Sequence, residues 1–182
     1  MNTSSVSTTL KKKALNLRLT GWSCFWLQLV GVLVSGISLL FVITGRQVSA
    51  QTNPAMGGGI FFAVCGILAA GASIVLSFWY TRVGQRLRKA DSTKPPPKSD
   101  LIRLVNLGLM IGLGGMLVTL MGSGLTAAVL VAKTISQPPG TTLTDASEAV
   151  RALDVLILVA NLNGVAAHFI GTVTSIWLKY RV

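Results

Sequence analysis

The chain has 182 residues, of which 51% are hydrophobic and only 12% charged, and its formal net charge is +11. A water-soluble domain of this length needs far more charge on its surface, so the composition excludes a soluble globular fold. No aromatic residue is interleaved with the basic residues over 82–98, which argues against a nucleic-acid-binding protein.

The first predicted element is a membrane-spanning helix over residues 22–44. It lies within an uncharged run from Leu19 to Gly45, and about 20 apolar residues suffice to cross a bilayer as a helix. The preceding segment, residues 1–20, contains four basic residues and no acidic one. We interpret it as a basic N-terminal arm outside the transmembrane domain, which occupies residues 21–182.

Two further helices are predicted over residues 59–80 and 101–132, joined by a basic, proline-rich loop over residues 81–100. The uncharged part of the third helix alone would measure about 43 Å as a straight helix, against a hydrocarbon core of about 30 Å. The helix must therefore tilt, extend past the core or break at one of its glycines. These glycines indicate either close helix packing or a discontinuous helix with exposed carbonyl groups.

The last predicted helix covers residues 153–178, in an uncharged run from Val155 to Leu178. Backbone polar groups in lipid must be satisfied internally, and the alternating pattern of a membrane β-barrel is absent. The predicted fold class is an all-α integral membrane protein with a bundle of four transmembrane helices.

Basic residues are distributed unevenly over the two sides of this bundle. Thirteen of the sixteen lie in the N-terminal arm, between Arg82 and Arg103, or in the C-terminal tail. The positive-inside rule then predicts that both termini and the middle loop face the cytoplasm or the stroma. We also expect the basic residues over 82–98 to attract anionic lipid headgroups, at about 1 kcal/mol per residue.

A layer of polar and sulfur-containing side chains is expected near the middle of the bundle. Asn161 and His168, the only histidine, are seven residues apart and share one helix face. When the rise per residue is counted from each helix end, side chains of the other three helices fall at about the same depth as His168. The predicted members are His168, Asn161, Gln28, Met110, Ser73, Asn106 and Asn163.

Two interpretations of this layer remain open. In the first, His168 is neutral and hydrogen-bonds Gln28 or a serine, and so fixes the order of the helices. In the second, His168 binds or relays a cation, with Met110, Gln28 and Asn161 assisting. No carboxylate lies deep in a predicted helix, so a complete metal site is not expected within one chain. Histidines of several copies facing one axis could supply it, with Asp154 collecting cations at the outer mouth.

Enzymatic activity and a permanently bound cofactor are not expected. The sequence contains no phosphate-binding loop, dinucleotide fingerprint, hydrolase motif or haem-attachment motif. Cys24 and Cys65 are predicted to differ in depth by about 15–20 Å, which is too far for a disulfide.

Several strings are similar to those of one known family. "FWLQLV" in the first helix and "ALDVLILVANLNGVAAHFIGTVTSIWL" in the last resemble the chloroplast inner-envelope permease and Tic-translocon protein family with its cyanobacterial relatives. The resemblance covers about residues 21–178 and carries over Asn161, Asn163 and His168 as possible site residues. The chain departs from the pattern at four positions, namely Gly112, Gly124, Val159 and Leu162, where more polar residues are expected.

The resemblance implies two functions of different classes. One is a permease-like protein that passes iron or another divalent metal ion, acting as an oligomer. The other is a non-transporting scaffold or accessory subunit of a larger membrane complex, including protein-translocation machinery. Either protein is expected in the plasma or thylakoid membrane of a cyanobacterium, associated with copies of itself or with other membrane proteins.

Overall fold

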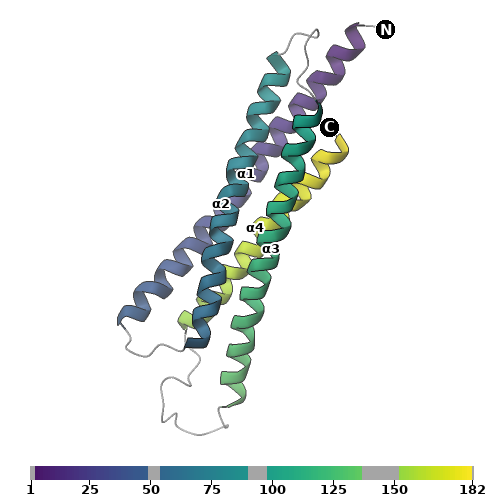
Figure 1. The fold of residues 1–182 in the computed structure, drawn as a ribbon. Helices are drawn as coiled ribbons and strands as arrows, with labels where there is room; N and C mark the ends of the chain where they lie inside the picture. The colour runs from purple at the N-terminus through teal and green to yellow at the C-terminus, as the bar shows by residue number, and fades with distance from the viewer. Residues whose placement is uncertain (1–2, 49–53, 90–97, 137–151, 182) are drawn as a thin grey trace.

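The computed structural model describes residues 3–48, 54–89, 98–136 and 152–181, which form four α-helices. These are α1 (Thr3–Val48), α2 (Pro54–Lys89), α3 (Lys98–Ile135) and α4 (Ala152–Arg181). Successive helices run antiparallel, so the two ends of the chain lie at the same end of the bundle (Figure 1). The predicted all-α fold with four helices is confirmed.

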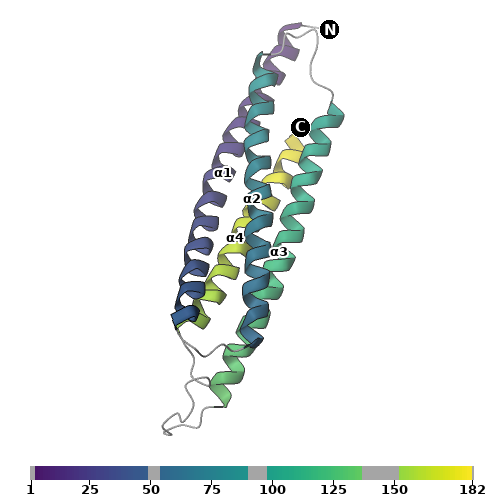
Figure 2. The ribbon, with the colours of Figure 1, turned by 60° about the vertical axis from the view of Figure 1, so that its left-hand side comes forward.

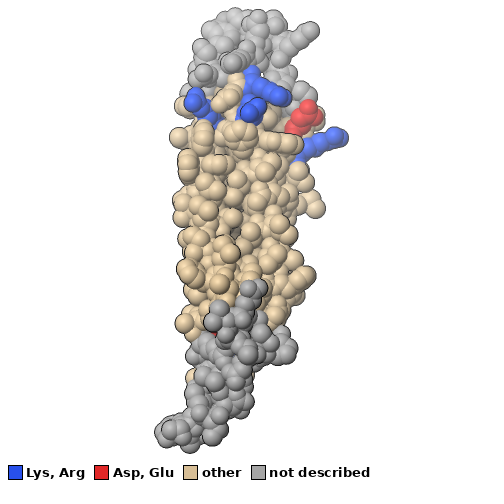
Figure 3. All heavy atoms as spheres, turned by 90° about the vertical axis from the view of Figure 1, so that its left-hand side faces the viewer, with Lys and Arg blue, Asp and Glu red and all other residues tan. Residues whose placement is uncertain are grey.

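All four helices are long and apolar enough to cross a membrane. The candidate spans are Ala14–Gly45, Met56–Arg86, Ser99–Ile135 and Ala152–Arg181. Many large apolar side chains point outward, for example Leu68 at 70% and Leu117 at 61% exposure. Figure 3 shows a broad uncharged band with lysine and arginine gathered at the end that carries the termini. We call this end the basic end.

The helices extend beyond the ranges expected from hydropathy. The segment described above as an N-terminal arm is helical from Thr3 onward and continues directly into the first span. Ala14 and Leu17 in this segment are buried, because they pack against the last turns of α2, where Gly84 lies next to both. Charged residues here end the apolar run but not the helix, since lysine and arginine are good helix formers.

The third helix is continuous from Lys98 to Ile135, so it is not a discontinuous helix. At 38 residues it is about 57 Å long and reaches past an apolar core of about 30 Å. Most of the predicted loop 81–100 is likewise helical, at the end of α2 and the start of α3. The rest of it, residues 90–97, lies outside the described residues, as do residues 137–151 of the opposite connection.

In the bundle, α2 and α4 occupy the short diagonal. Both α1 and α3 contact α2 and α4, and α2 also contacts α4. Within the described residues, α1 and α3 do not contact each other (Figures 1 and 2). A polar side chain on the inner face of α4 can therefore meet any of the other three helices.

Glycines set the separation between neighbouring helices. A Cβ atom on Gly84 would lie 3.0 Å from the carbonyl oxygen of Ala14, and one on Gly164 would lie 2.7 Å from Cγ2 of Thr119. Lipid provides no hydrophobic drive for helix association, so close backbone packing of this kind holds transmembrane helices together.

Apolar clusters occupy the two ends of the bundle and leave its middle to polar groups. The cluster at the basic end includes Leu17, Tyr80 and Leu178, and the one at the opposite end includes Val42, Met56 and Ile157. The buried side chains between them are mainly small or polar. The fold thus places its polar residues deep inside the apolar band.

Candidate functional site

Three of the buried polar side chains of α4 lie in a row on its inner face. Asn161 and His168 are 0% exposed and Thr172 is 5% exposed. They lie seven and four residues apart, so they share one face of the helix and extend over about 16 Å of its length. We call these three residues the α4 polar row.

His168 in the centre of the row is held by the backbone of α2. Its Nε2 atom lies 3.1 Å from the carbonyl oxygen of Gly66. A carbonyl oxygen only accepts hydrogen bonds, so Nε2 carries the proton and donates it. In the neutral ring, Nδ1 then keeps its lone pair. Nδ1 is buried and has no hydrogen-bond partner among the described residues.

The other two members of the row also carry an unpartnered polar atom. The amide nitrogen of Asn161 donates to the carbonyl oxygens of Gly59, at 3.1 Å, and Ile157, at 3.0 Å. Its Oδ1 atom is buried without a hydrogen-bond partner in the described part of the chain, and the same holds for Oγ1 of Thr172. The row therefore presents three buried atoms with free lone pairs.

All three unpartnered atoms face glycines of α3. A Cβ atom on Gly122 would collide with Oδ1 of Asn161, one on Gly115 with the His168 ring, and one on Gly112 with Oγ1 of Thr172. The α3 wall opposite the row consequently has no side chain at these three points. We call this contact zone the α3–α4 seam.

Gln28 forms a separate, fully bonded cluster that joins three helices. Its Nε2 atom donates to Oγ of Ser73 on α2, at 2.8 Å, and to the carbonyl oxygen of Ala167 on α4, at 3.3 Å. The hydroxyl of Ser77 lies 3.2 Å from Oε1 of Gln28. The first interpretation of His168 was therefore wrong about its partner, because Gln28 is engaged with Ser73 and His168 bonds a backbone carbonyl.

Three of the predicted layer residues do not join these groups. Met110 is 72% exposed on the outer face of α3, because the inner face of α3 is taken by its glycines. Asn163 is half-buried and its amide donates to the carbonyl of Val159 on its own helix, at 2.9 Å. Asn106 is also half-buried. Gln28 meets α4 at Ala167, next to His168, so the two groups lie at a similar level but are bonded separately, and Met110 lies outside both.

Asp154 is not free to collect cations at the mouth of the bundle. It forms a 2.7 Å ion pair with Lys133, and both side chains are less than 10% exposed. This pair was not predicted from the sequence, although a signal for it was present. Lys133 directly follows one apolar run and Asp154 directly precedes the next, and two antiparallel helices bring such positions together.

His168 also lies too deep to meet its counterpart in another copy. At 0% exposure it faces the interior of its own bundle, so histidines of several copies do not line one axis in this arrangement. Within the described residues no three of His, Cys, Asp and Glu are grouped to hold a metal ion. Cys24 and Cys65 are both free thiols.

Thr172 and Tyr80 are polar residues of the interior that the sequence analysis did not single out. Thr172 lies one helical turn after His168, and this spacing could have indicated that it shares the inner face of α4. The Tyr80 hydroxyl donates to the carbonyl oxygen of Leu104, at 3.3 Å, and lies 3.4 Å from Oγ of Ser175. Tyr80 thus joins α2 to α3 and α4.

Comparison with known proteins covers almost the whole chain. The model of a family described as "Protein of unknown function (DUF3611)" matches residues 7–182. The chain is 34% identical over 185 residues to "Protein TIC 21, chloroplastic" of Arabidopsis thaliana, covering 97% of this chain and 60% of the relative. The chain therefore spans about three fifths of the length of that relative. No solved structure matches the present chain.

The family match and the four apolar helices agree with each other. The protein is a multi-pass integral membrane protein, and the resemblance to the chloroplast permease and Tic-translocon proteins is confirmed by its similarity to TIC 21. On a match that extends from residue 7 to the last residue, the chain belongs to the family DUF3611.

Proposed function

We propose that this protein is a permease-like membrane protein that passes a divalent metal ion along the α3–α4 seam. Iron is the ion that the family resemblance implies. The observation that carries the proposal is the α4 polar row, in which three buried atoms on one helix face lack hydrogen-bond partners within the described residues. Buried polar atoms are normally satisfied, so an unsatisfied set calls for an ion, water or a functional role.

The chemistry of the row suits transient contact with a cation. An imidazole nitrogen with a free lone pair is a ligand for borderline metals such as iron, and amide and hydroxyl oxygens add harder ligands. The hydrogen bond from Nε2 to Gly66 fixes which nitrogen is free, as outer partners do for metal-binding histidines. The row has no carboxylate or thiolate, so binding is weak, and an ion that must leave again needs weak binding.

Passage along this route requires α3 to move away from α4. The two helices are in direct contact at Gly112, Gly115 and Gly122, so the arrangement described corresponds to a closed state. Glycines on the α3 side make such a separation easier, because no side chain has to be withdrawn from between the polar groups. In this proposal the protein works without a catalytic step, in the plasma or thylakoid membrane of a cyanobacterium.

The experiment is metal uptake by vesicles that contain the purified protein, measured with an enclosed metal-sensitive dye. In His168→Gln, a side-chain amide can still donate to the Gly66 carbonyl, but no ring nitrogen remains at the Nδ1 position. We expect the initial rate of Fe²⁺ uptake to fall at least about tenfold, which corresponds to about 1.4 kcal/mol.

The matched control is Asn163→Ala, which removes an amide of the same helix that, within the described residues, bonds to the backbone of its own helix. This variant should keep the wild-type rate. Equal uptake by wild type and His168→Gln would remove the row from the pathway. Equal loss in both variants would mean that uptake reports the integrity of the bundle.

A second candidate function is an accessory subunit of a membrane protein complex, such as one for protein translocation. The observation that favours it is a set of outward-facing glycines with open space beside them, at Gly36, Gly71, Gly114 and Gly124. Small residues on the lipid-facing side allow a partner helix to approach closely. The similarity to a protein named TIC 21 supports the same proposal.

Native mass spectrometry after gentle extraction tests this candidate. Stable association with other membrane proteins, lost in Gly114→Leu and kept in Leu113→Ala, would support an accessory role. Leu113 is the exposed neighbour of Gly114, so this control changes the same surface without blocking close approach. Recovery of the chain alone would count against the accessory role and leave the permease.

A further inference from the structure

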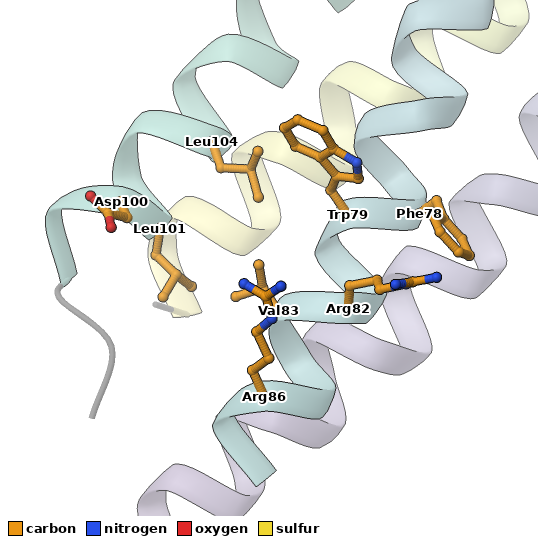
Figure 4. Close-up of a pocket in the computed structure, with 8 residues that line it drawn as sticks. All are labelled: Phe78, Trp79, Arg82, Val83, Arg86, Asp100, Leu101 and Leu104. Carbon is orange, nitrogen blue, oxygen red and sulfur yellow. The ribbon is translucent and has the colours of Figure 1, made fainter. Parts of the chain in front are cut away.

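A groove lies between the end of α2 and the beginning of α3, at the basic end of the bundle. Its volume is about 690 Å³, within the range of about 300–1,000 Å³ that is typical of small-molecule sites. It is separate from the α3–α4 seam, and the functions proposed above do not use it. Its lining residues are Phe78, Trp79, Arg82, Val83, Arg86, Asp100, Leu101 and Leu104 (Figure 4).

The lining changes from apolar to charged along α2. Phe78 and Trp79 lie on the membrane side and are 39% and 53% exposed, whereas Arg82 and Arg86 follow one and two turns later. Leu101 and Leu104 form the opposite wall on α3 (Figure 4). Both candidate spans reach this level, because the α2 span ends at Arg86 and the α3 span begins at Ser99. The groove is thus apolar toward the bilayer and basic toward water.

The charges at the mouth of the groove are arranged on two sides. Arg82 lies over the ring of Phe78, with its Cζ atom 5.0 Å from the ring centroid. Figure 4 shows Arg86 extending along α2 toward Val83, with Asp100 across the groove on α3. The lining residues therefore carry two positive charges and one negative charge, which favours an anion that also offers hydrogen-bond donors to Asp100.

We propose that this groove binds one anionic phospholipid whose headgroup carries hydroxyl groups. Arg86 and Arg82 bind the phosphodiester, and headgroup hydroxyls donate to the Asp100 carboxylate. An acyl chain lies against Trp79, Leu101 and Leu104. Basic pockets between transmembrane helices bind phosphorylated headgroups in this way, and a planar guanidinium suits phosphate oxygens better than an ammonium does.

Native mass spectrometry on protein from nanodiscs tests the proposal, with phosphatidylglycerol as the probe in an excess of phosphatidylcholine. The wild type should retain one phosphatidylglycerol. The double variant Arg82→Gln/Arg86→Gln should bind it about 30-fold more weakly, at about 1 kcal/mol per lost charge. Leu104→Phe narrows the groove without changing its charge, and it should also lower retention.

Arg103→Gln is the matched control. Arg103 is an exposed basic residue of α3 at the same end of the bundle, and it does not line the groove. This variant should retain the lipid like the wild type. If Arg103→Gln and Arg86→Gln lose the lipid equally, the lipid is attracted to the basic end in general. That result would refute binding in the groove. Equal retention of phosphatidylethanolamine would overturn the selectivity for an anionic headgroup.

The charge variants alone decide the outcome if Leu104→Phe does not fold. Arg82 and Arg86 are exposed, so their replacement leaves the helix packing intact. A double variant that keeps full retention would refute the proposal.

Discussion

Gly114 and Gly115 are neighbours in the sequence, yet only Gly115 meets a side chain. A Cβ atom on Gly115 would collide with the imidazole ring of His168, whereas one on Gly114 would meet nothing within 4 Å. The ring cannot easily move aside, because Nε2 is bonded to the Gly66 carbonyl. Substituting each glycine in turn therefore distinguishes the effect of a steric clash from the effect of helix propensity, at almost the same depth in the bundle.

We expect Gly115→Ala to destabilise the protein by about 1–3 kcal/mol through overpacking. Gly114→Ala should be neutral or stabilising by up to about 1 kcal/mol, because alanine is the better helix former. Unfolding by a denaturing detergent, followed by circular dichroism, measures both. Similar stabilities for the two variants would contradict the close contact between α3 and His168.

The ion pair between Lys133 and Asp154 also makes a prediction at the scale of residues. Asp154→Leu leaves an ammonium group in a site where the Lys133 side chain is 9% exposed, and breaking such a pair costs about 3–5 kcal/mol. The double variant Lys133→Met/Asp154→Leu should recover at least half of that loss. Thermal unfolding in detergent checks this, and a double variant as unstable as the single one would show that the pair is not the main contact.

At the scale of elements, α1 is attached to α2 and α4 through Gln28 and Ser35. Gln28 donates to Ser73 and to the Ala167 carbonyl, and Ser35 donates to the Ala160 carbonyl at 2.9 Å. Interhelical hydrogen bonds in membranes contribute about 0.6 kcal/mol each. The attachment of α1 thus depends on several weak bonds and on close packing.

We expect Gln28→Met to lower the free energy of unfolding by about 1–2 kcal/mol, because the shape is kept and the interhelical bonds are lost. Leu27→Met is the control, since Leu27 is 55% exposed on the adjacent position. Unfolding curves of the two variants in the same detergent compare them directly. A Gln28→Met protein as stable as the control would show that packing alone holds α1.

Helix positions along the membrane normal could be predicted from the sequence, but rotations about the helix axes could not. Uncharged runs located all four spans, and the seven-residue spacing of Asn161 and His168 placed both on the inner face of α4. Met110 was matched to His168 by depth alone. It lies two residues from both Gly108 and Gly112, which is about 200° around the helix, so it points outward once those glycines pack inward.

The hydrogen-bond partner of each polar group could also not be predicted from the sequence. His168 bonds the carbonyl of Gly66, which a helix normally keeps for its own amide groups. That contact depends on how closely α2 and α4 approach, and the positions of polar residues along the sequence do not give this distance. A list of polar residues identifies the groups that need partners, but not which backbone atoms come within reach.

At the scale of the whole molecule, the distribution of charge makes a prediction about orientation. Ser99 lies at the basic end and Thr134 at the opposite end, and both are exposed. In a background with Cys24 and Cys65 replaced by alanine, we expect Ser99→Cys to react with an impermeant maleimide only from the cytoplasmic side. Thr134→Cys should react only from the other side. Labelling of both from one side would contradict a membrane crossing by α3.

Polar contacts join the two successive helix pairs to each other as well as the helices within each pair. Ser73 and Ser77 of α2 match Gln28 of α1, and Lys133 of α3 neutralises Asp154 of α4. Between the pairs, His168 of α4 donates to the Gly66 carbonyl of α2, and Ser35 of α1 donates to the Ala160 carbonyl of α4. Each pair alone therefore leaves these polar side chains in the bilayer without their partners, which is costly in lipid. Two separately translated halves, ending at Lys89 and beginning at Lys98, should consequently depend on each other, so that each half accumulates in the membrane only when both are expressed.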